Sequence, residues 1–489
     1  MEHFDVIIMG AGLSGIDAAH HMQTLCPKKS YAILEQRGQI GGTWDLFRYP
    51  GVRSDSDMFT MSHGFRPWKG PRALSPGSEI REYVQAVAHD EGIDRHIYFH
   101  HHARRASWST QEATWTVEAD QTLPDGTQKP VTMTCNFLFS CAGYYQYSKG
   151  YTPDFPGIES FQGKVVHPQA WPQDLDYTGK KVVIIGSGAT AVTLVPGMAK
   201  TAGHVTMLQR SPTYIVSRPG IDKIANQLRS VLPAKLAHHL ARFKNIAFSM
   251  YVYLLAQQNP NYVKKIIEKQ TRKALGPDYP VGTHFNPHYK PWEQRLCLVP
   301  DGDLFEAIRS GAASIVTDKI DTMTPTGIRL QSGQELEADI IVTATGLVMR
   351  QIGGVELTVD GRPVETGKTL SYKGMMMSGV PNFANIFGYI NASWTLKADL
   401  ICTYVCRLLN YMEKKGVRQV VPVSDTVAPE TSFIANFSSG YIQRGLATAP
   451  KQGTKKPWRV HQNYVLDIIS LGSKNFNNGA LKFSSPGSH

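Results

Sequence analysis

Residues 4–15 read Phe-Asp-Val-Ile-Ile-Met-Gly-Ala-Gly-Leu-Ser-Gly, and this stretch decides the fold. Its first six residues are largely apolar and β-branched, as in a buried strand, and a helical pattern follows the last glycine. In such a unit the first glycine permits a tight turn, the second lets the backbone approach a pyrophosphate, and the third lets helix and strand pack closely. The helix N-terminus then presents free N–H groups to the phosphates. The stretch therefore predicts a dinucleotide site that includes Gly10, Gly12, Ser14 and Gly15.

An acidic residue follows the next predicted strand, residues 31–34. This residue is Glu35, which lies 20 residues after Gly15. A carboxylate at that spacing can accept hydrogen bonds from ribose hydroxyls. Strand, helix, second strand and acid together predict an FAD site, and the alternative is a glycine turn in an ordinary α/β unit.

The same pattern returns 176 residues later, with Gly186 in the place of Gly10. An apolar run over 181–185 precedes a second glycine-rich turn. We expect this turn to bind a nucleotide through Gly186, Ser187, Gly188, Ala189 and Thr190. The next predicted strand, 204–209, ends in Arg210 and Ser211, so that a guanidinium stands where the acid is expected. Arginine can clamp a 2′-phosphate, which predicts NADPH at this unit; the alternative is a solvated surface arginine.

Two such motifs predict an α/β fold with two Rossmann-like dinucleotide-binding domains, one for FAD and one for NADP. Strand signals vanish between residues 221 and 276, where apolar residues recur at helical spacing. From Lys223 to Ala274 there are ten basic residues and one acid, a local net charge of +9. This region is predicted to be a helical insertion in the NADP domain. The predicted division is 1–150 and 361–489 for the FAD domain and C-terminal tail, 151–220 and 291–360 for the NADP domain, and 221–290 for the insertion.

Three smaller expectations complete the outline of the fold. Two short strands that end in small-residue turns, within 137–143 and 339–346, suit chain crossings between the domains, although generic strand-end turns are almost as good a reading. A helix is predicted over 395–415. The tail from residue 451, rich in Gly, Ser, Lys and Pro, is expected to be irregular.

Composition excludes several classes of protein. With 489 residues, 42% of them hydrophobic, the chain can bury large cores and is not intrinsically disordered. Its six cysteines form no CxxC pair and no set at zinc spacing, and three consecutive histidines, 100–102, would point to alternating faces of a strand. No metal site is therefore expected. The N-terminal stretch lacks the features of a signal peptide, so a cytoplasmic location with reduced thiols is expected.

Between the two nucleotide motifs lies Phe161-Gln-Gly163-Lys-Val-Val-His167-Pro-Gln-Ala-Trp171-Pro172. This stretch matches FxGxxxHxxxWP, and the chain accordingly resembles the type I Baeyer–Villiger monooxygenases, which are class B flavoprotein monooxygenases. The resemblance is closest to the branch with the ethionamide-activating monooxygenase of mycobacteria. The shared stretches are GGTWDLFRYPG (41–51), RSDSDM (53–58), RLCLVP (295–300) and NASWTLKADL (391–400).

The resemblance implies an NADPH- and O2-dependent enzyme that oxygenates ketones to esters or lactones through a C4a-peroxyflavin. Oxidation of thioether and thioamide sulfur is also implied. Arg295 would stabilise the anionic intermediates and Asp55 would orient Arg295. A guanidinium stays charged and offers fixed donors to a developing oxyanion, which supports this role independently. The implied flavin-side contacts are Thr43, Trp44, Asp45, Arg53, Ser54 and Asp55, and the implied linker residues are Phe161, Gly163, His167 and Trp171.

Other functions remain open at this point. An N- or S-oxygenating flavin monooxygenase that uses a hydroperoxyflavin is the nearest rival, although Trp171-Pro172 argues against it. A disulfide reductase would need a redox cysteine pair near the flavin. A non-catalytic basic protein could bind nucleic acid or anionic lipid through the basic helices. We expect a small ketone or sulfide as substrate and no nucleic acid. The basic insertion is either a solubilising surface or a surface for peripheral membrane contact, and no sequence feature decides between these or specifies an oligomeric state.

Overall fold

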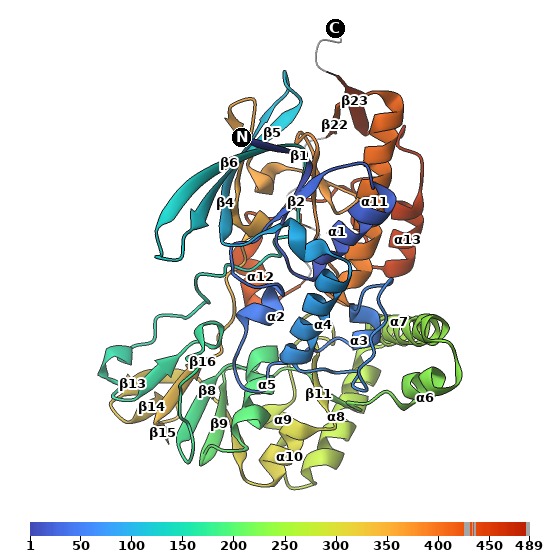
Figure 1. Ribbon diagram of the computed structural model, residues 1–489. Coiled ribbons are helices and arrows are strands. Elements are labelled where there is room, and N and C mark those ends of the chain that lie inside the picture. The colour runs from blue at the N-terminus through green and yellow to red at the C-terminus, as the bar shows by residue number, and fades with distance from the viewer. Residues whose placement is uncertain (425–430, 433, 435–436, 486–489) are drawn as a thin grey trace.

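The computed structural model describes residues 1–424, 431–432, 434 and 437–485, and its two lobes are shown in Figure 1. The upper lobe contains the first glycine motif and the lower lobe the second. Both lobes are α/β, as the two motifs predict.

The first lobe is built on a sheet in the order β18-β17-β4-β5-β6-β1-β2-β3, with β21 also paired to β6. The strands around β1 are parallel, whereas β4, β5 and β6 form an antiparallel meander. The inner half of β1 is buried on both faces, as is typical of parallel strands. The strands are β1 Glu2–Met9, β2 Tyr31–Leu34, β3 Ile97–Tyr98, β4 His101–Ser109, β5 Thr114–Thr122, β6 Gln128–Ser140, β17 Glu356–Val359, β18 Arg362–Pro363 and β21 Phe383–Asn385.

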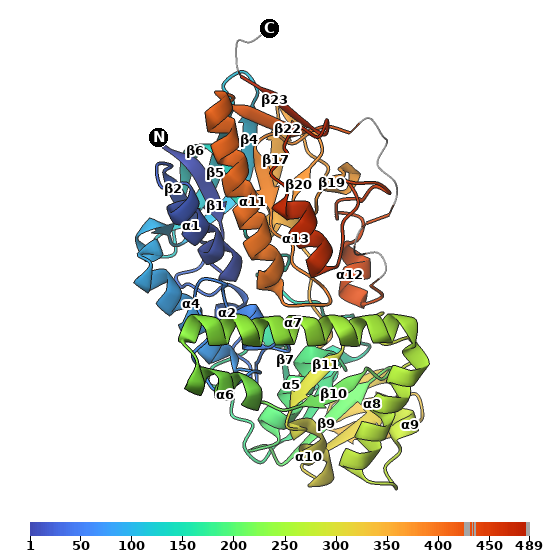
Figure 2. The same ribbon diagram turned by 90° about the vertical axis from the view of Figure 1, so that its right-hand side faces the viewer.

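Helices α1 (Leu13–Leu25) and α11 (Trp394–Lys415) pack against each other on this lobe, as Figure 2 shows. Helix α11 ends at Lys415. The next residue, Gly416, has a φ of 66° and caps the helix in the left-handed conformation. The predicted helix over 395–415 is confirmed. The other helices of the lobe are α2 Thr43–Leu46, α3 Met58–Met61, α4 Gly77–Asp90, α12 Gly440–Gly445 and α13 Tyr464–Gly472.

The expectation of an irregular tail is wrong. Helix α13 lies along α11, and β23 (Leu481–Ser484) pairs with β22 (Gln419–Pro422). Leu471 and Phe476 are buried in the same core as α11. A few well-spaced apolar side chains therefore order this segment despite its composition.

The second lobe contains a parallel sheet in the order β12-β9-β8-β16-β7. Strand β8 is buried from its second residue onward and leads into α5 through the second glycine motif. The sheet strands are β7 Lys164–Val166, β8 Lys181–Ile185, β9 His204–Gln209, β12 Ala313–Thr317 and β16 Ile340–Thr343. The remaining elements are α5 Ala189–Met198, α10 Asp303–Arg309, the pair β10 Ile215–Arg218 and β11 Cys297–Pro300, and a meander of β13 Ile320–Thr324, β14 Gly327–Leu330 and β15 Glu335–Glu337.

The helical insertion is present, but it packs differently from a simple surface appendage. Its helices are α6 Lys223–Val231, α7 Ala234–Gln258, α8 Pro260–Leu275 and α9 Val281–His284. In Figure 2, α7 crosses the molecule where the two lobes meet, and it contacts α3 of the first lobe. Arg242 of α7 is 7% exposed and donates hydrogen bonds to the carbonyls of Phe59, Thr60 and Ser62. One of the ten basic residues is thus a buried link between the lobes.

The chain passes between the lobes at two neighbouring segments. The Gln146 amide donates to the Val348 carbonyl at 2.9 Å, and the Arg350 amide donates to the Tyr144 carbonyl at 2.9 Å. These segments directly follow β6 and β16, next to the predicted crossings. The predicted boundary at residue 360 needs correction, because β17 already pairs with β4 of the first lobe. The other boundaries stay predictions.

No helix in the described part of the chain is both long enough and apolar enough to cross a membrane.

Candidate active site

A cavity of about 1330 Å³ extends along the junction of the lobes and is lined by both glycine motifs. Gly10, Gly12 and Ser14 border it from the first motif. Gly186, Ser187, Gly188, Ala189 and Thr190 border it from the second. The two predicted nucleotide sites therefore open into one continuous space.

The first motif has the geometry that a pyrophosphate requires. A Cβ at Gly15 would lie 1.8 Å from the Gly10 carbonyl oxygen, so only glycine lets α1 approach the turn this closely. Gly12 caps α1 without any side-chain hydrogen bond, which leaves the first N–H groups of the helix free toward the cavity. Gly42 lies opposite, 3.5 Å from a Cβ placed on Gly12. This cradle of bare backbone fits the phosphates of FAD.

Glu35 lies at the end of β2 beside this cradle. Its Oε2 accepts from the Ala11 amide at 2.8 Å and its Oε1 accepts from the Arg37 amide at 2.8 Å. The residue is 4% exposed, and burial raises the pKa of its carboxyl above the ordinary value. Because Glu35 borders the cavity, its remaining lone pairs can accept from a ribose.

The second motif is more open. A Cβ at Gly188, the N-cap of α5, would contact nothing within 4 Å, so the helix N-terminus faces free space. Ser187 Oγ donates to the Ser211 carbonyl at 3.0 Å, which fixes the turn next to Arg210. Arg210 and Ser211 are exposed and border the same cavity. The residues fit a nucleotide with an additional phosphate on its ribose.

Arg295 and Asp55 are brought together from 240 positions apart. Arg295 Nε lies 2.6 Å from Asp55 Oδ2, and its Nη2 donates to Asp55 Oδ1 at 2.7 Å, a bidentate pair on the cavity wall. The Ser56 hydroxyl also contacts Nη2, at 3.2 Å. Burial opposes the charge of Arg295, but the carboxylate of Asp55 and the neighbouring Tyr144, Tyr441 and Tyr145 together outweigh it and raise the pKa of the guanidinium. The pair therefore presents a permanent, oriented cation to the cavity.

Aromatic side chains that sequence reasoning missed surround this pair. Tyr144 stacks on Trp394 with ring centroids 5.2 Å apart, and its hydroxyl lies 2.5 Å from that of Tyr145. Burial raises the pKa of Tyr144 and of Tyr441 well above the ordinary value. The run Tyr144-Tyr145-Gln-Tyr147 directly after the first crossing was the available signal, because residues at a crossing between lobes line their junction.

Three predicted flavin-side residues differ from expectation. Asp45 is 1% exposed and does not border the cavity; its carboxylate instead pairs with Arg37 at 2.6 Å and with Arg48. Arg53 borders the cavity, but its guanidinium forms a bidentate pair with Asp303 of the second lobe. Ser54 also borders the cavity and donates its hydroxyl to the Ser56 carbonyl at 2.8 Å. Thr43 and Trp44 border the cavity as predicted.

The FxGxxxHxxxWP residues make packing contacts within the second lobe and at the second crossing. A Cβ at Gly163 would lie 2.3 Å from the Asp339 carbonyl oxygen. His167 Nε2 lies 3.2 Å from the Gly346 carbonyl oxygen, at the second crossing. Phe161 is buried under the β13–β15 meander, and Trp171 packs against the core of the second lobe. Their contacts are structural, as expected of linker residues.

Comparison with known proteins agrees with this geometry. Residues 71–351, more than half of the chain, match the family described as flavin-binding monooxygenase-like. The chain belongs to this family. Residues 8–79 of this monooxygenase also match the NAD(P)-binding Rossmann-like domain, and these residues include the first glycine motif.

Relatives of this monooxygenase cover nearly its full length. It is 53% identical over 487 residues to the FAD-containing monooxygenase EthA of Mycobacterium tuberculosis, with 99% of this chain and 98% of the relative covered. It is 49% identical over 484 residues to the probable FAD-binding monooxygenase AlmA of Acinetobacter baylyi, with 99% and 96% covered.

Solved structures share the fold of this monooxygenase at low sequence identity. A steroid monooxygenase bound to NADP has a TM-score of 0.79 and 21% identity, with 99% of this chain and 100% of the other covered. Cyclohexanone monooxygenase in an open form has a TM-score of 0.77 and 18% identity, with the same coverage. The predictions of a two-domain dinucleotide fold and of a flavin monooxygenase are confirmed, and the disulfide reductase and the non-catalytic binding protein are set aside.

Proposed function

We propose that this monooxygenase uses FAD, NADPH and O2 to insert one oxygen atom beside a ketone carbonyl, giving an ester or lactone. Oxygenation of thioether and thioamide sulfur is a parallel activity. The observation that carries the proposal is the bidentate Arg295–Asp55 pair in the cavity that both glycine motifs border. Bound FAD, once reduced by NADPH, supplies the oxygen-activating chemistry.

The protein's own residues stabilise charge. Arg295 offers N–H donors to negative charge that develops in the cavity, and a guanidinium performs this without losing a proton. Asp55 fixes the plane of the guanidinium through two contacts, so little reorganisation is needed during reaction. Because burial raises the pKa of Tyr144 and Tyr441, both hydroxyls stay protonated and act only as hydrogen-bond donors or acceptors. The aromatic wall also excludes water, which protects a reactive oxygen species.

Nucleotide and substrate choice draw further support from the relatives. EthA is named as FAD-containing, and the solved steroid monooxygenase is named as bound to NADP. Over nearly its whole length the chain also shares the fold of cyclohexanone monooxygenase, an enzyme whose name refers to a ketone. With FxGxxxHxxxWP and Arg210, these similarities favour NADPH-dependent ketone oxygenation over N-oxygenation.

The test replaces Arg295 by alanine in the FAD-loaded enzyme. Flavin reduction by NADPH should persist, whereas formation of ester from a panel of linear, cyclic and aromatic ketones should fall at least ~100-fold, as for loss of an oxyanion donor. Arg295→Lys should recover little activity, since lysine lacks the bidentate geometry. Arg309→Ala, which removes an exposed arginine paired with Glu306, is the matched control.

Full ester formation by the Arg295→Ala enzyme would overturn the assignment. Wild-type enzyme that oxygenates amines or sulfides but forms no ester from any ketone would favour the rival, an N- or S-oxygenating monooxygenase. Product analysis by mass spectrometry after incubation with 18O2 separates these results.

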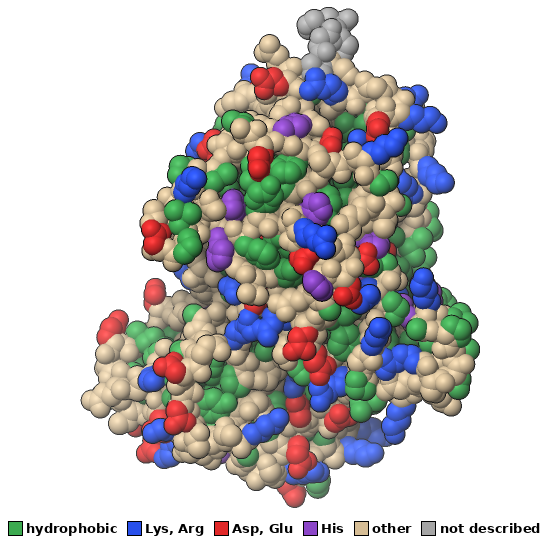
Figure 3. All heavy atoms as spheres, in the orientation of Figure 1, with side chains coloured by type: hydrophobic (Ala, Val, Ile, Leu, Met, Phe, Trp, Pro, Cys, Tyr) green, Lys and Arg blue, Asp and Glu red, His purple; other side chains and the backbone are tan. Residues whose placement is uncertain are grey.

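We also propose that the insertion docks on an anionic lipid surface. The outward side of α7 carries an apolar row of Leu236, Leu240, Phe243, Tyr251 and Leu254, exposed by 42% to 72%. In Figure 3, Lys and Arg side chains gather at the lower right, where α6, α7 and α8 lie. Exposed lysines of this region include Lys223, Lys235, Lys265, Lys269 and Lys273. An amphipathic basic surface of this kind fits the interface of an anionic bilayer.

Vesicle co-sedimentation tests this proposal. The enzyme should bind vesicles rich in phosphatidylglycerol and release at high salt, and Phe243→Ser with Tyr251→Ser should weaken binding about tenfold. Val165→Ser removes a similarly exposed apolar side chain on β7 and serves as control. Equal binding to neutral and anionic vesicles, or none to either, would contradict the proposal.

A further inference from the structure

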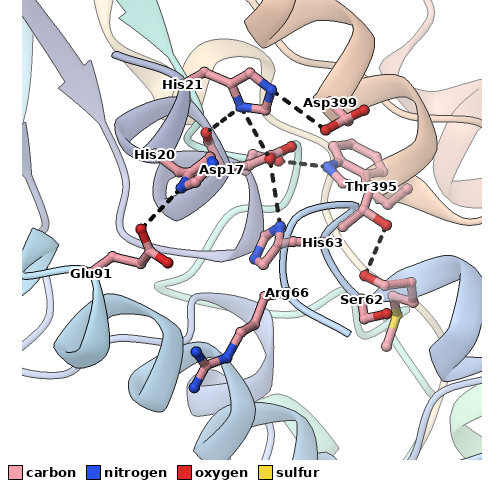
Figure 4. Close-up of polar contacts among 12 residues, drawn as sticks. Asp17, His20, His21, Ser62, His63, Arg66, Glu91, Thr395 and Asp399 are labelled. Carbon is pink, nitrogen blue, oxygen red and sulfur yellow. Dashed lines mark hydrogen bonds and ion pairs between the residues drawn. The ribbon is translucent and has the colours of Figure 1, made fainter. Parts of the chain in front are cut away.

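Four ionisable side chains converge behind the first glycine motif. Asp17 and His21 lie on α1, Asp399 lies on α11, and His63 lies in the segment that follows α3. Figure 4 shows the four side chains turned toward one another between these elements. The proposed function does not use any of them, and none borders the dinucleotide cavity.

Each of these four side chains lies within 3.6 Å of at least one other. Asp17 Oδ1 lies 3.6 Å from His63 Nδ1, and His21 Nε2 lies 3.5 Å from Asp399 Oδ1. Ligand atoms of Asp17, His21 and Asp399 all lie within 4.8 Å of one another. His21 Nδ1 lies 2.9 Å from the Asp17 carbonyl oxygen, and this contact holds the proton on Nδ1 and leaves the Nε2 lone pair free for a ligand.

Two members of the cluster are buried without hydrogen-bond partners. Asp17 is fully buried, and neither carboxylate oxygen has a hydrogen bond. His63 is 1% exposed, and neither ring nitrogen has one, although stacking on Phe65 at 5.0 Å fixes the ring. A buried carboxylate left in this state is strongly unfavourable. Asp17 Oδ1 lies 3.5 Å from His21 Nδ1 and 3.6 Å from His63 Nδ1, and neither contact is a hydrogen bond.

We propose that Asp17, His21 and Asp399, whose ligand atoms lie within 4.8 Å of one another, bind one divalent transition-metal ion, with Zn²⁺ the best match and His63, 3.6 Å from Asp17, as the fourth ligand. Two imidazole nitrogens and two carboxylate oxygens are a typical zinc ligand set. At metal–ligand bonds of about 2.0–2.1 Å, the edge of a tetrahedron is about 3.3–3.4 Å. Two of the contacts, His21 Nε2–Asp399 Oδ1 at 3.5 Å and Asp17 Oδ1–His63 Nδ1 at 3.6 Å, are close to that length, and the ligand atoms of Asp17, His21 and Asp399, spread over up to 4.8 Å, would have to move closer together around a bound ion.

The surroundings fit a structural ion. The two carboxylates supply two negative charges, and Arg242 is the cation that acts on Asp399 besides the two histidines. The Asp399 side chain is 30% exposed and Gly64 lies beside it, which leaves an entry path. The ion would join α1 to α11 one turn beyond the contact of Trp394 Nε1 with Ser14 Oγ, at 2.7 Å.

The competing explanation is a set of three His–Asp ion pairs without metal, and zinc titration separates the two explanations. FAD-loaded enzyme is treated with a chelator, exchanged into metal-free buffer, and titrated with ZnCl2 by calorimetry, with bound zinc measured by mass spectrometry. We expect about one zinc per chain and a raised melting temperature. Asp17→Asn and His63→Phe, which nearly preserve shape, should each bind zinc more than ~100-fold more weakly.

His238→Phe is the matched control, because His238 is also buried and has no hydrogen bond on either ring nitrogen. It should bind zinc as the wild type does. Co²⁺ added to the wild type should give visible absorption typical of tetrahedral coordination, a readout that needs no variant. Failure of the chelator-treated wild type to take up zinc or cobalt, or unchanged binding in Asp17→Asn, would overturn the proposal in favour of ion pairs.

Discussion

Buried ionisable side chains in this monooxygenase fall into paired and unpaired kinds. Lys397 is 1% exposed, and its Nζ lies 2.5 Å from Asp467 Oδ2, which also accepts from the Tyr389 hydroxyl at 2.7 Å. His238 on α7, in contrast, has no hydrogen-bond partner. Burial and the nearby Arg242 lower the pKa of His238 to about 4. The unpaired His238 therefore titrates at a lower pH in the folded chain than in the unfolded chain.

Replacement of His238 by phenylalanine should reduce the loss of unfolding free energy that occurs as the pH falls. Between pH 6.5 and pH 4 the unfolded chain protonates His238 whereas the folded chain does not, so the free energy of unfolding falls as pH drops. At pH 4.5 this loss amounts to about 2–3 kcal/mol, and it should be absent in His238→Phe. Urea denaturation at pH 7.5 and 4.5 measures it. His89→Phe, at an exposed histidine, should retain the wild-type dependence.

Residue roles could be predicted where a motif specifies the backbone and not where it leaves the side chain free. The glycines and Glu35 could be placed because turn geometry and ribose chemistry constrain them. Asp45 could not, because nothing in its local sequence reveals that Arg37 and Arg48 fold over it. The Asp17–His63 contact joins residues 46 positions apart, a pairing that only the packing of α1 against its neighbours creates.

Helices α1 and α5 perform the same task in the two lobes, and the strand that follows each helix distinguishes them. After β2 comes Glu35, which is buried, and after β9 comes Arg210, which is exposed at the cavity. A carboxylate repels a ribose 2′-phosphate, whereas a guanidinium binds it. We therefore infer that one position at the end of each strand encodes the cofactor preference.

Replacement of Arg210 by aspartate should reverse the preference between NADPH and NADH. A charge-assisted contact with a phosphate contributes about 1.5–3 kcal/mol, so kcat/KM for NADPH should fall about 10–100-fold while that for NADH changes little or rises. Steady-state cofactor oxidation measures both values. Lys180→Asp, a lysine of the same lobe that does not border the cavity, is the control. An unchanged ratio would show that Arg210 does not contact the 2′-phosphate.

Element prediction succeeded where the hydrophobic period was long and failed where burial came from distant partners. The helix over 395–415 carries a regular apolar face against α1, which made it predictable. The insertion was predicted as helical, but the attachment of α7 to the first lobe was not, since Arg242 binds three backbone carbonyls rather than acidic side chains. Because every residue has a backbone carbonyl, the sequence does not reveal which carbonyls accept such hydrogen bonds.

Polar contacts cross the junction of the two lobes at several points, among them the Arg295–Asp55 pair and the hydrogen bonds of Arg242. Arg53 of the first lobe pairs with Asp303, at the start of α10 in the second, at N–O distances of 2.5 and 3.1 Å. Arg53 is 10% exposed on its side chain, so the pair is largely shielded from water. The net charge of +11 is unevenly distributed along the chain, because residues 223–274 alone carry +9.

Asp303→Asn should weaken the contact between the two lobes but leave the nucleotide sites able to bind their cofactors. It leaves the Arg53 charge without its anionic partner, which should lower the free energy of unfolding by about 1–3 kcal/mol. FAD content should stay at the wild-type level, whereas flavin reduction by NADPH, measured by stopped-flow absorbance, should slow about tenfold because the lobes no longer hold one alignment. Glu306→Gln, at an exposed position of the same helix, should change neither value.

The neighbouring crossings have a consequence for how this molecule can be rebuilt. Because the chain enters and leaves the second lobe at hydrogen-bonded segments, the whole lobe is a cassette with one attachment point. A cassette from another family member could be grafted at residues 146 and 348 without lengthening the chain. The contacts that cross the junction would have to be re-created, among them the Arg53–Asp303 and Arg295–Asp55 pairs and the hydrogen bonds of Arg242 to three backbone carbonyls of the first lobe.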